Sequence, residues 1–278
     1  MLGKLLRNEF RSTYKPMLII YLMTILSTAL GCFLFRDSSR SSLPDEVENV
    51  LTITFVLSYT FVVIALVILV FIMTCERFYK SMYSEQGYLT HTLPVSPLSN
   101  LNARLITSIV WLLISGVILV LSISSINLAN DPDGFINGLR AISYRDLEQG
   151  ALYSTGYHFP VLLLIILLLI LAACCNSLLL VYAALSLGQL ASLHKIRAAI
   201  GIGIGLAFVE QIIATVIITH IPDRWFSVSP AAGFEEIRNA IIHSTQTGLW
   251  FSIGMFSAFA ILYYAVCALI VKKHVNLE

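Results

Sequence analysis

The chain has 278 residues, of which 58% are hydrophobic and only 12% are charged, and its mean hydropathy is +0.85. Soluble domains usually carry about 25% charged residues, so this composition excludes an ordinary soluble domain and indicates a membrane protein. Seventeen Lys and Arg residues against sixteen Asp and Glu residues give a formal net charge of +1, which offers no basic surface for nucleic acid.

The N-terminal residues predict a basic amphipathic helix. Basic and apolar side chains alternate there with near-helical spacing: the basic ones are Lys4, Arg7, Arg11 and Lys15, and the apolar ones are Leu2, Leu5, Leu6 and Phe10. Such a segment is typical of a helix that lies on the inner surface of the membrane, and we assign residues 1–16 to it. The same residues also fit a positively charged flank of the first membrane span, and the two interpretations are compatible.

Six apolar segments follow, each close to the roughly 20 residues that cross a bilayer as a helix. They cover about 17–35, 50–73, 105–126, 160–186, 198–220 and 249–271. Backbone polar groups in lipid must bond within their own segment, so we predict an all-α, multi-pass membrane protein with six transmembrane helices. We expect one transmembrane domain over residues 1–278.

The distribution of charge between the loops predicts the orientation. The two termini and the loops 74–104 and 187–197 together hold eleven Lys and Arg residues and four acidic residues. The loops 36–49, 127–159 and 221–248 hold six Lys and Arg residues and eleven acidic residues. Because Lys and Arg are enriched in cytoplasmic loops, we predict that both termini lie in the cytoplasm.

The loop at 74–104 mixes charged residues, aromatic residues and turn signals. Four residues with helical spacing would form an aromatic face: Phe78, Tyr79, Met82 and Tyr83. Gly87 is a natural helix end, and Ser96 followed by Pro97 is typical of the start of the next helix. The loop therefore predicts a helix, a turn and a second helix. It fits either a docking surface for a soluble partner or an amphipathic segment lying on lipid.

The segment from Tyr83 to Ser96 reads Tyr-Ser-Glu-Gln-Gly-Tyr-Leu-Thr-His-Thr-Leu-Pro-Val-Ser, and it follows a basic N-terminal helix and two spans and precedes four more spans. This order resembles the membrane subunits of ABC transporters of the ABC-2 (type V exporter) class. More narrowly, the chain is similar to permeases of Gram-positive bacteria that are encoded apart from their ATPase. The resemblance covers essentially the whole chain and implies a location in the cytoplasmic membrane.

The resemblance also implies partners and a coupling site. ATP and Mg would be bound by two copies of a separate ABC ATP-binding subunit, and a second permease would complete a homodimer or heterodimer. In that family the loop after the second span holds the coupling helix, which corresponds here to about 76–87. The residues assigned to coupling are Glu76, Arg77, Phe78, Tyr79, Met82, Tyr83, Glu85 and Gly87. The family further implies short extracellular helices near 230–243. Its members export peptides, drugs, polysaccharides or lipids.

No nucleotide-binding or metal-binding motif is present in the sequence. It contains no Gly-x-x-x-x-Gly-Lys-[Ser/Thr] phosphate loop. Gly201 and Gly205 lie inside an apolar segment with no lysine after them, and we interpret them as glycines that let two helices pack closely. The six histidines do not pair at helical spacing. We therefore predict no catalytic residue, no cofactor and no metal in this chain.

Glu210 is the one charged residue inside the six predicted spans, and Gln211 follows it. Ionised carboxyls in a membrane are costly and usually face a bundle interior or a wet cavity. Glu210 and Gln211 fit residues of the substrate path. Glu210 fits equally a protonated or hydrogen-bonded carboxyl that fixes helix contacts, with Asn176 as a candidate partner. Thr54 and Ser58 share one face of the second span and fit either the same path or helix-to-helix bonding.

Two other functions remain open on the sequence. Phe234-Glu-Glu-Ile-Arg238 is close to the Glu-Glu-x-x-x-Arg motif of CAAX-type membrane proteases. Its arginine comes one residue too early for that motif, and the acidic pair is predicted outside the cell. A stand-alone channel or carrier would need no ATPase, and the loop at 74–104 argues against it because it resembles a docking surface.

Overall fold

The computed structural model describes residues 2–34, 45–83, 96–191, 194–220 and 233–273. All regular structure in these residues is α-helical, which confirms the predicted all-α class. The helices are α1 (Leu2–Leu34), α3 (Asp45–Tyr83), α5 (Pro97–Asn130), α6 (Pro132–Ala141), α7 (Tyr144–Thr155), α8 (Phe159–Gly188), α9 (Lys195–His220) and α10 (Phe234–Lys273).

Six helices in the described part of the chain are long and apolar enough to cross a membrane: α1, α3, α5, α8, α9 and α10. Each contains one of the six predicted spans, so the chain is an all-α membrane protein with six spans. The helices form two compact units. Unit 1 comprises Met1–Lys80 and Asn102–Ala141, and unit 2 comprises Ser81–Leu101 and Ile142–Glu278.

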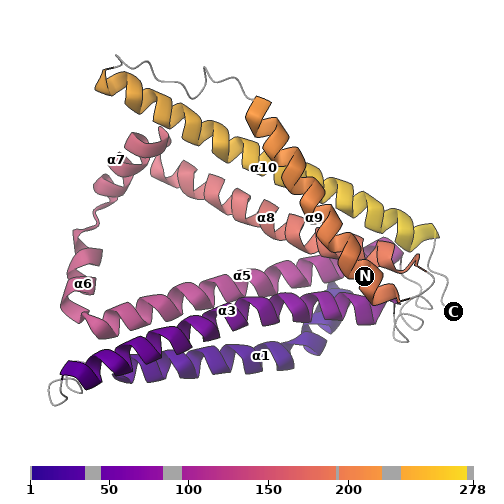
Figure 1. The fold of residues 1–278 in the computed structure, drawn as a ribbon, viewed down its shortest axis with the longest axis horizontal. Coiled ribbons are helices and arrows are strands. Elements are labelled where there is room, and N and C mark those ends of the chain that lie inside the picture. Colours follow the sequence, from indigo (N-terminus) through magenta and orange to yellow (C-terminus); the bar gives the residue numbers. More distant parts are fainter. Residues whose placement is uncertain (1, 35–44, 84–95, 192–193, 221–232, 274–278) are drawn as a thin grey trace. The chain divides into compact units, whose positions relative to one another are not determined.

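In unit 1, α1, α3 and α5 run side by side (Figure 1). Their core contains Met17 and Tyr21 from α1 together with Leu66 and Val70 from α3, and Trp111 of α5 packs against it. The hydroxyl of Tyr21 bonds Ser115 of α5 at 2.9 Å between the two oxygens. Apolar packing and hydroxyl bonds therefore hold these three spans together, as expected where lipid supplies no hydrophobic driving force between helices.

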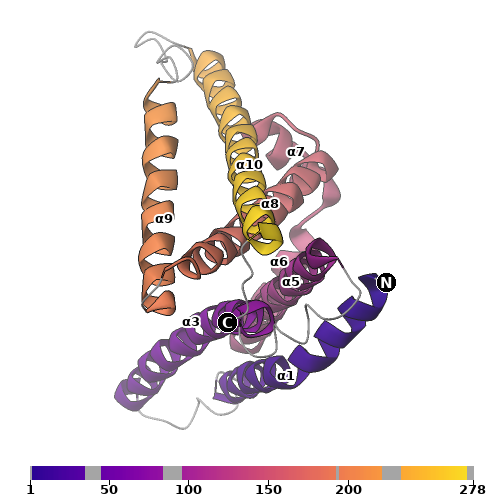
Figure 2. The same cartoon turned by 90° about the vertical axis from the view of Figure 1, so that its right-hand side faces the viewer.

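In unit 2, α8 and α10 pack along each other and α9 crosses α8 (Figures 1 and 2). Tyr182 and Ser186 of α8 and Cys267 of α10 are fully buried in it. The short helix α7 packs against both α8 and α10. Gly156 ends α7 with a φ of +69°, a left-handed conformation that favours glycine, and a Cβ there would lie 2.8 Å from Ile242.

Glu148 of α7 caps the beginning of α8. Its carboxylate accepts a hydrogen bond from the backbone N–H of Phe159 at 2.9 Å and bonds Nδ1 of His158. These bonds lower the pKa of Glu148, the bond with His158 contributing most and the bond from Phe159 next. The carboxylate thereby satisfies one of the N–H groups that a helix start leaves without a partner.

We expect the start of α8 to loosen in acid. Because the pKa of Glu148 is lowered in the folded chain, its carboxylate stabilises the folded junction above the ordinary Glu pKa of about 4.3. That contribution is lost as the pH falls through the lower pKa of the folded state. Amide hydrogen exchange at Phe159, corrected for its intrinsic rate, should accelerate over this range. In Glu148→Gln the extra acceleration should be absent, and an unchanged pH profile in that variant would contradict the prediction.

The predicted interfacial segment, residues 1–16, is not a separate helix. It forms the first turns of α1, which continues to Leu34 with Pro16 inside it. Proline removes one backbone hydrogen bond and bends a helix, and α1 changes direction along its length (Figure 2). The basic side chains at its start are exposed, whereas Glu9 and Thr13 are buried.

Two further helix boundaries differ from the prediction. The expected coupling helix at 76–87 is continuous with α3, which runs to Tyr83, and Glu85 and Gly87 lie outside the described residues. The expected short helices near 230–243 are instead the first turns of α10, which begins at Phe234. Neither expected break contains a proline, so no backbone hydrogen bond is removed there and one helix continues. The predicted start of α5 at Pro97 is confirmed.

Candidate functional site

A polar cluster inside unit 2 joins three membrane helices. Asn176 of α8 donates a hydrogen bond from Nδ2 to Oε1 of Glu210 of α9 at 2.6 Å. The hydroxyl of Tyr263 of α10 donates to Oε2 of the same carboxyl at 3.1 Å. The sequence predicted Asn176 as a partner but not Tyr263, because a tyrosine in an apolar segment gives no signal that its hydroxyl is used.

Burial strengthens the hydrogen bonds of this cluster, and one buried atom in it has no hydrogen-bond partner in the described residues. Asn176 and Tyr263 are 5% and 2% exposed, and Glu210 is half-buried. Hydrogen bonds to a carboxyl are stronger in such surroundings than in water. The other amide atom of Asn176, the acceptor Oδ1, is buried and has no hydrogen-bond partner in the described residues. The cluster therefore holds more acceptors than donors.

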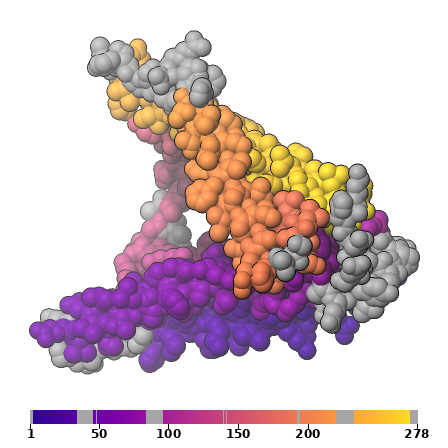
Figure 3. Space-filling model, turned by 45° about the vertical axis from the view of Figure 1, so that its right-hand side comes forward, coloured from indigo at the N-terminus to yellow at the C-terminus, as the bar shows by residue number. Residues whose placement is uncertain are grey.

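Gln211 lies outside this cluster. Its side chain is exposed, and its backbone carbonyl accepts a bond from the hydroxyl of Thr215 on the same helix. Most side chains of α9 are exposed, and Figure 3 shows this helix in orange. Of the two neighbouring residues assigned to the substrate path, Glu210 therefore belongs to the polar cluster and Gln211 does not.

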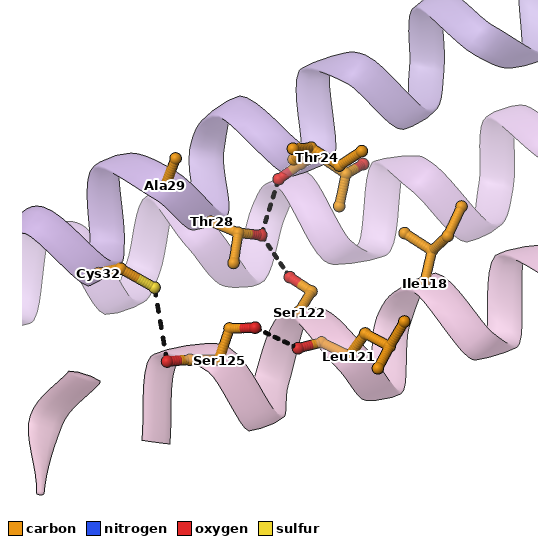
Figure 4. Close-up of a pocket in the computed structure, with 9 residues that line it drawn as sticks. Thr24, Thr28, Ala29, Cys32, Ile118, Leu121, Ser122 and Ser125 are labelled. Carbon is orange, nitrogen blue, oxygen red and sulfur yellow. Dashed lines mark hydrogen bonds between the residues drawn. The ribbon is translucent and has the colours of Figure 1, made fainter. Parts of the chain in front are cut away.

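Unit 1 contains a cavity of about 320 Å³ between α1 and α5 (Figure 4). Its lining combines hydroxyl, thiol and apolar side chains and contains no charged residue: Thr24, Ile25, Thr28, Ala29, Cys32, Ile118, Leu121, Ser122 and Ser125. Thr28 and Ser122 bond across it with 2.5 Å between their oxygens, and Cys32 donates from Sγ to the carbonyl of Ser125 at 3.4 Å. The cavity is thus suited to an uncharged, partly polar group.

From the sequence, the hydroxyl side chains of a polar path were expected on the second span and not on the first and third. Thr54 and Ser58 are exposed, and their hydroxyls bond carbonyls of their own helix, those of Val50 and Phe55. Neither lines the cavity. The missed signal was the spacing of Thr24 and Thr28, with Cys32, at four-residue intervals along the first span.

The end of α3 carries the residues assigned to coupling, and the structure divides them by burial. Phe78 and Met82 are fully buried, whereas Tyr79 and Tyr83 are half-buried. Tyr83 donates its hydroxyl to Ser186 of α8 at 2.7 Å. The side chains of Phe78 and Met82 are therefore covered by this chain, and the assignment of all four residues to coupling stays a prediction.

Charged residues at the same end of unit 1 surround a second cavity, of about 310 Å³. Glu76, Arg77 and Lys80 of α3 line it together with Ser12, Thr13, Pro16, Met17 and Met73. Arg77 donates from Nε to Glu9 of α1 at 3.1 Å, and Nε of Arg104 of α5 lies 3.7 Å from the other oxygen of Glu9. Glu9 thus ties α1 to both neighbouring helices.

Gly201 and Gly205 meet no neighbouring helix within unit 2 in the described residues, so their predicted packing role stays a prediction. A Cβ built on either glycine would meet no atom within 4 Å. The close approach of α9 to α8 lies on the opposite side of the helix, where a Cβ on Gly188 of α8 would lie 2.8 Å from the backbone of Ala199. Four-residue spacing marks a helix face, but it does not say which face meets a neighbour.

Substituting these glycines should have opposite effects on stability. Gly188→Ala forces the backbones of α8 and α9 apart, and overpacking of this kind costs about 1–3 kcal/mol. Gly201→Ala meets no atom and should be neutral or stabilising by about 0.5–1 kcal/mol, the usual helix preference for alanine. The measurement is the free energy of unfolding in mixed detergent. Equal effects of the two substitutions would contradict the observed packing of α9.

The acidic pair near the start of α10, Glu235 and Glu236, is exposed. Glu235 pairs with Arg238 on the same helix with 2.5 Å between the charged atoms, and its side chain is 67% exposed. No group of three or more His, Cys, Asp and Glu side chains gathers as metal ligands in the described residues. The arrangement at this position is that of an exposed ion pair within one helix.

No family model, no curated protein and no solved structure matches this chain. Its own sequence and structure define it as a multi-pass, all-α membrane protein with polar clusters inside its spans.

Proposed function

We propose that the chain is the permease subunit of an ATP-driven exporter of the ABC-2 class. It would sit in the cytoplasmic membrane with both termini inside, as in Gram-positive relatives of that class. Two copies of a separate ATP-binding subunit would hold ATP and Mg, and a second permease would complete the dimer. The six spans and the absence of a phosphate loop from the sequence support a transport subunit over an enzyme.

The observation that carries the proposal is that the two ends of the loop between α3 and α5 belong to unit 2. The described residues at the two ends of this loop, 81–83 and 96–101, belong to unit 2, although the chain before and after them belongs to unit 1. Tyr83 holds the end of α3 to α8 through Ser186. A force applied to this loop would therefore act on both units through the covalent chain, which is what a coupling element must do.

Exposed charged residues beside the loop offer a surface for the ATP-binding subunit. Glu76 and Lys80 form an ion pair at 2.5 Å, with side chains 44% and 57% exposed. Charged residues at the rim of an interface set its orientation and association rate more than its affinity. Glu76 and Lys80, rather than Phe78 and Met82, are thus the described residues best placed to meet a partner.

Co-purification tests the proposal. The chain should be extracted from its native membrane in a mild detergent and its partners identified by mass spectrometry. We expect an ATP-binding subunit in equal number with the permeases, and ATP hydrolysis by the complex. Recovery of the chain without any ATPase, under conditions that keep related complexes intact, would overturn the proposal.

A further inference from the structure

Glu210 is the one acidic residue in the predicted membrane spans of this protein. The six predicted spans contain no Lys, Arg or Asp and no second Glu. Asn176 and Tyr263 donate hydrogen bonds to its carboxyl, but both are neutral, so neither is a counter-ion. Ionisable residues at such a depth pair with another charge or mark the path of an ion or substrate. The spans offer Glu210 no cationic side chain.

Asn176 adds a second, independent sign of a missing group. Its Oδ1 is an acceptor without a partner in the described residues, on a side chain that is 95% buried. Buried polar atoms nearly always have a partner, and an exception calls for an explanation. Oδ1 belongs to the same amide group as Nδ2, which bonds Glu210, so it lies close to that carboxyl.

These oxygens together define the chemistry of the group that would satisfy them. A carboxylate and an amide oxygen need a positive charge and more than one N–H donor. A primary ammonium supplies both, because it carries three donors on one compact cation. A quaternary ammonium carries the charge without a donor, and an alcohol carries a donor without the charge.

The surroundings of Glu210 indicate that the rest of such a ligand is apolar. The carboxyl is half-buried, so it is reachable. The residues three positions before and after it share its face of α9, and both are exposed and apolar: Ala207 and Ile213, the latter 38% exposed. A ligand with an ammonium head and an apolar body would match this surface when it approaches from the bilayer.

We propose that Glu210 and Asn176 bind the protonated primary amine of an amphipathic ligand. The amine donates N–H bonds to the free positions of the Glu210 carboxylate and to Oδ1 of Asn176, and its charge neutralises the carboxylate. If the proposed export function holds, on which this last step rests, amphipathic amines are the class of substrate that unit 2 receives.

The test is equilibrium binding of radiolabelled dodecylamine to the purified chain in lipid nanodiscs, without any ATP-binding subunit. We expect saturable binding above that of empty nanodiscs. Dodecyltrimethylammonium and dodecanol should each compete at least about tenfold more weakly, since each lacks one of the two features. Equal competition by either compound, or no binding above empty nanodiscs, would overturn the proposal. The competition uses the unaltered protein and does not depend on the folding of a variant.

Variants then assign the site. Glu210→Gln and Asn176→Ala should each weaken dodecylamine binding at least about tenfold. Gln211→Ala is the matched control, because Gln211 is exposed and lies outside the cluster. Dodecylamine binding by this variant should be unchanged. Undiminished binding in Glu210→Gln would refute the assignment. If the chain binds dodecylamine but co-purifies with no ATPase, only the export function is disproved. If it co-purifies with an ATPase but does not bind dodecylamine, only the amine site is disproved.

Discussion

Replacing Phe78 by alanine is expected to destabilise the protein by about 3–5 kcal/mol, and Met82→Ala by about 2–5 kcal/mol. Both side chains are fully buried, so truncation removes buried apolar surface and leaves a cavity near the end of α3. Tyr79, one position from Phe78 on the same helix, is half-buried, and Tyr79→Ala should cost clearly less. The measurement is the free energy of unfolding in mixed detergent, with α-helical content followed by circular dichroism.

This expectation changes how coupling must be tested. A Phe78→Ala/Met82→Ala double variant that lost its ATPase would have lost it through unfolding, so it would say nothing about docking. Glu76→Ala and Lys80→Ala remove exposed groups and leave the core intact. If Phe78→Ala proved no more destabilising than Tyr79→Ala, the burial of this face of α3 would be wrong.

The sequence was sufficient for features that depend on hydropathy alone. Long apolar segments fixed the six spans because a bilayer demands about 20 apolar residues for each helix. The contact of Asn176 with Glu210 was also predictable, because polar side chains are rare in such segments and seek one another. Pro97 marked the start of α5 because its missing N–H is not needed there.

Features that depend on helix packing were beyond the sequence. Phe78/Met82 and Tyr79/Tyr83 have the same spacing, and only the neighbouring helices decide which pair is buried. The grouping of the helices into two compact units was beyond the sequence for the same reason, since hydropathy marks a span without saying which spans pack together. Sequence spacing marked the face of Gly201 and Gly205, but it could not show that α9 meets α8 at Ala199, which lies on another face.

Removing the carboxyl of Glu9 should be as damaging as removing Phe78. Glu9 is 8% exposed and holds both Arg77 and Arg104, and Arg104 is itself 4% exposed. Breaking a buried ion pair from one side typically costs about 3–5 kcal/mol, because the remaining charge loses its compensation away from water. We therefore expect Glu9→Ala to lower the free energy of unfolding by about this amount and to release the N-terminal turns of α1.

The matched control for Glu9 is the exposed ion pair of Glu76 and Lys80. It lies on α3 close to Arg77, but its side chains are 44% and 57% exposed. Water screens such a pair, so Glu76→Ala should change stability by no more than about 0.5 kcal/mol. Glu9→Gln keeps the shape and one acceptor and should fall between the two. Hydrogen exchange across residues 2–16 would report the release of α1, and a Glu9→Ala variant as stable as Glu76→Ala would show that this buried cluster does not anchor the helix.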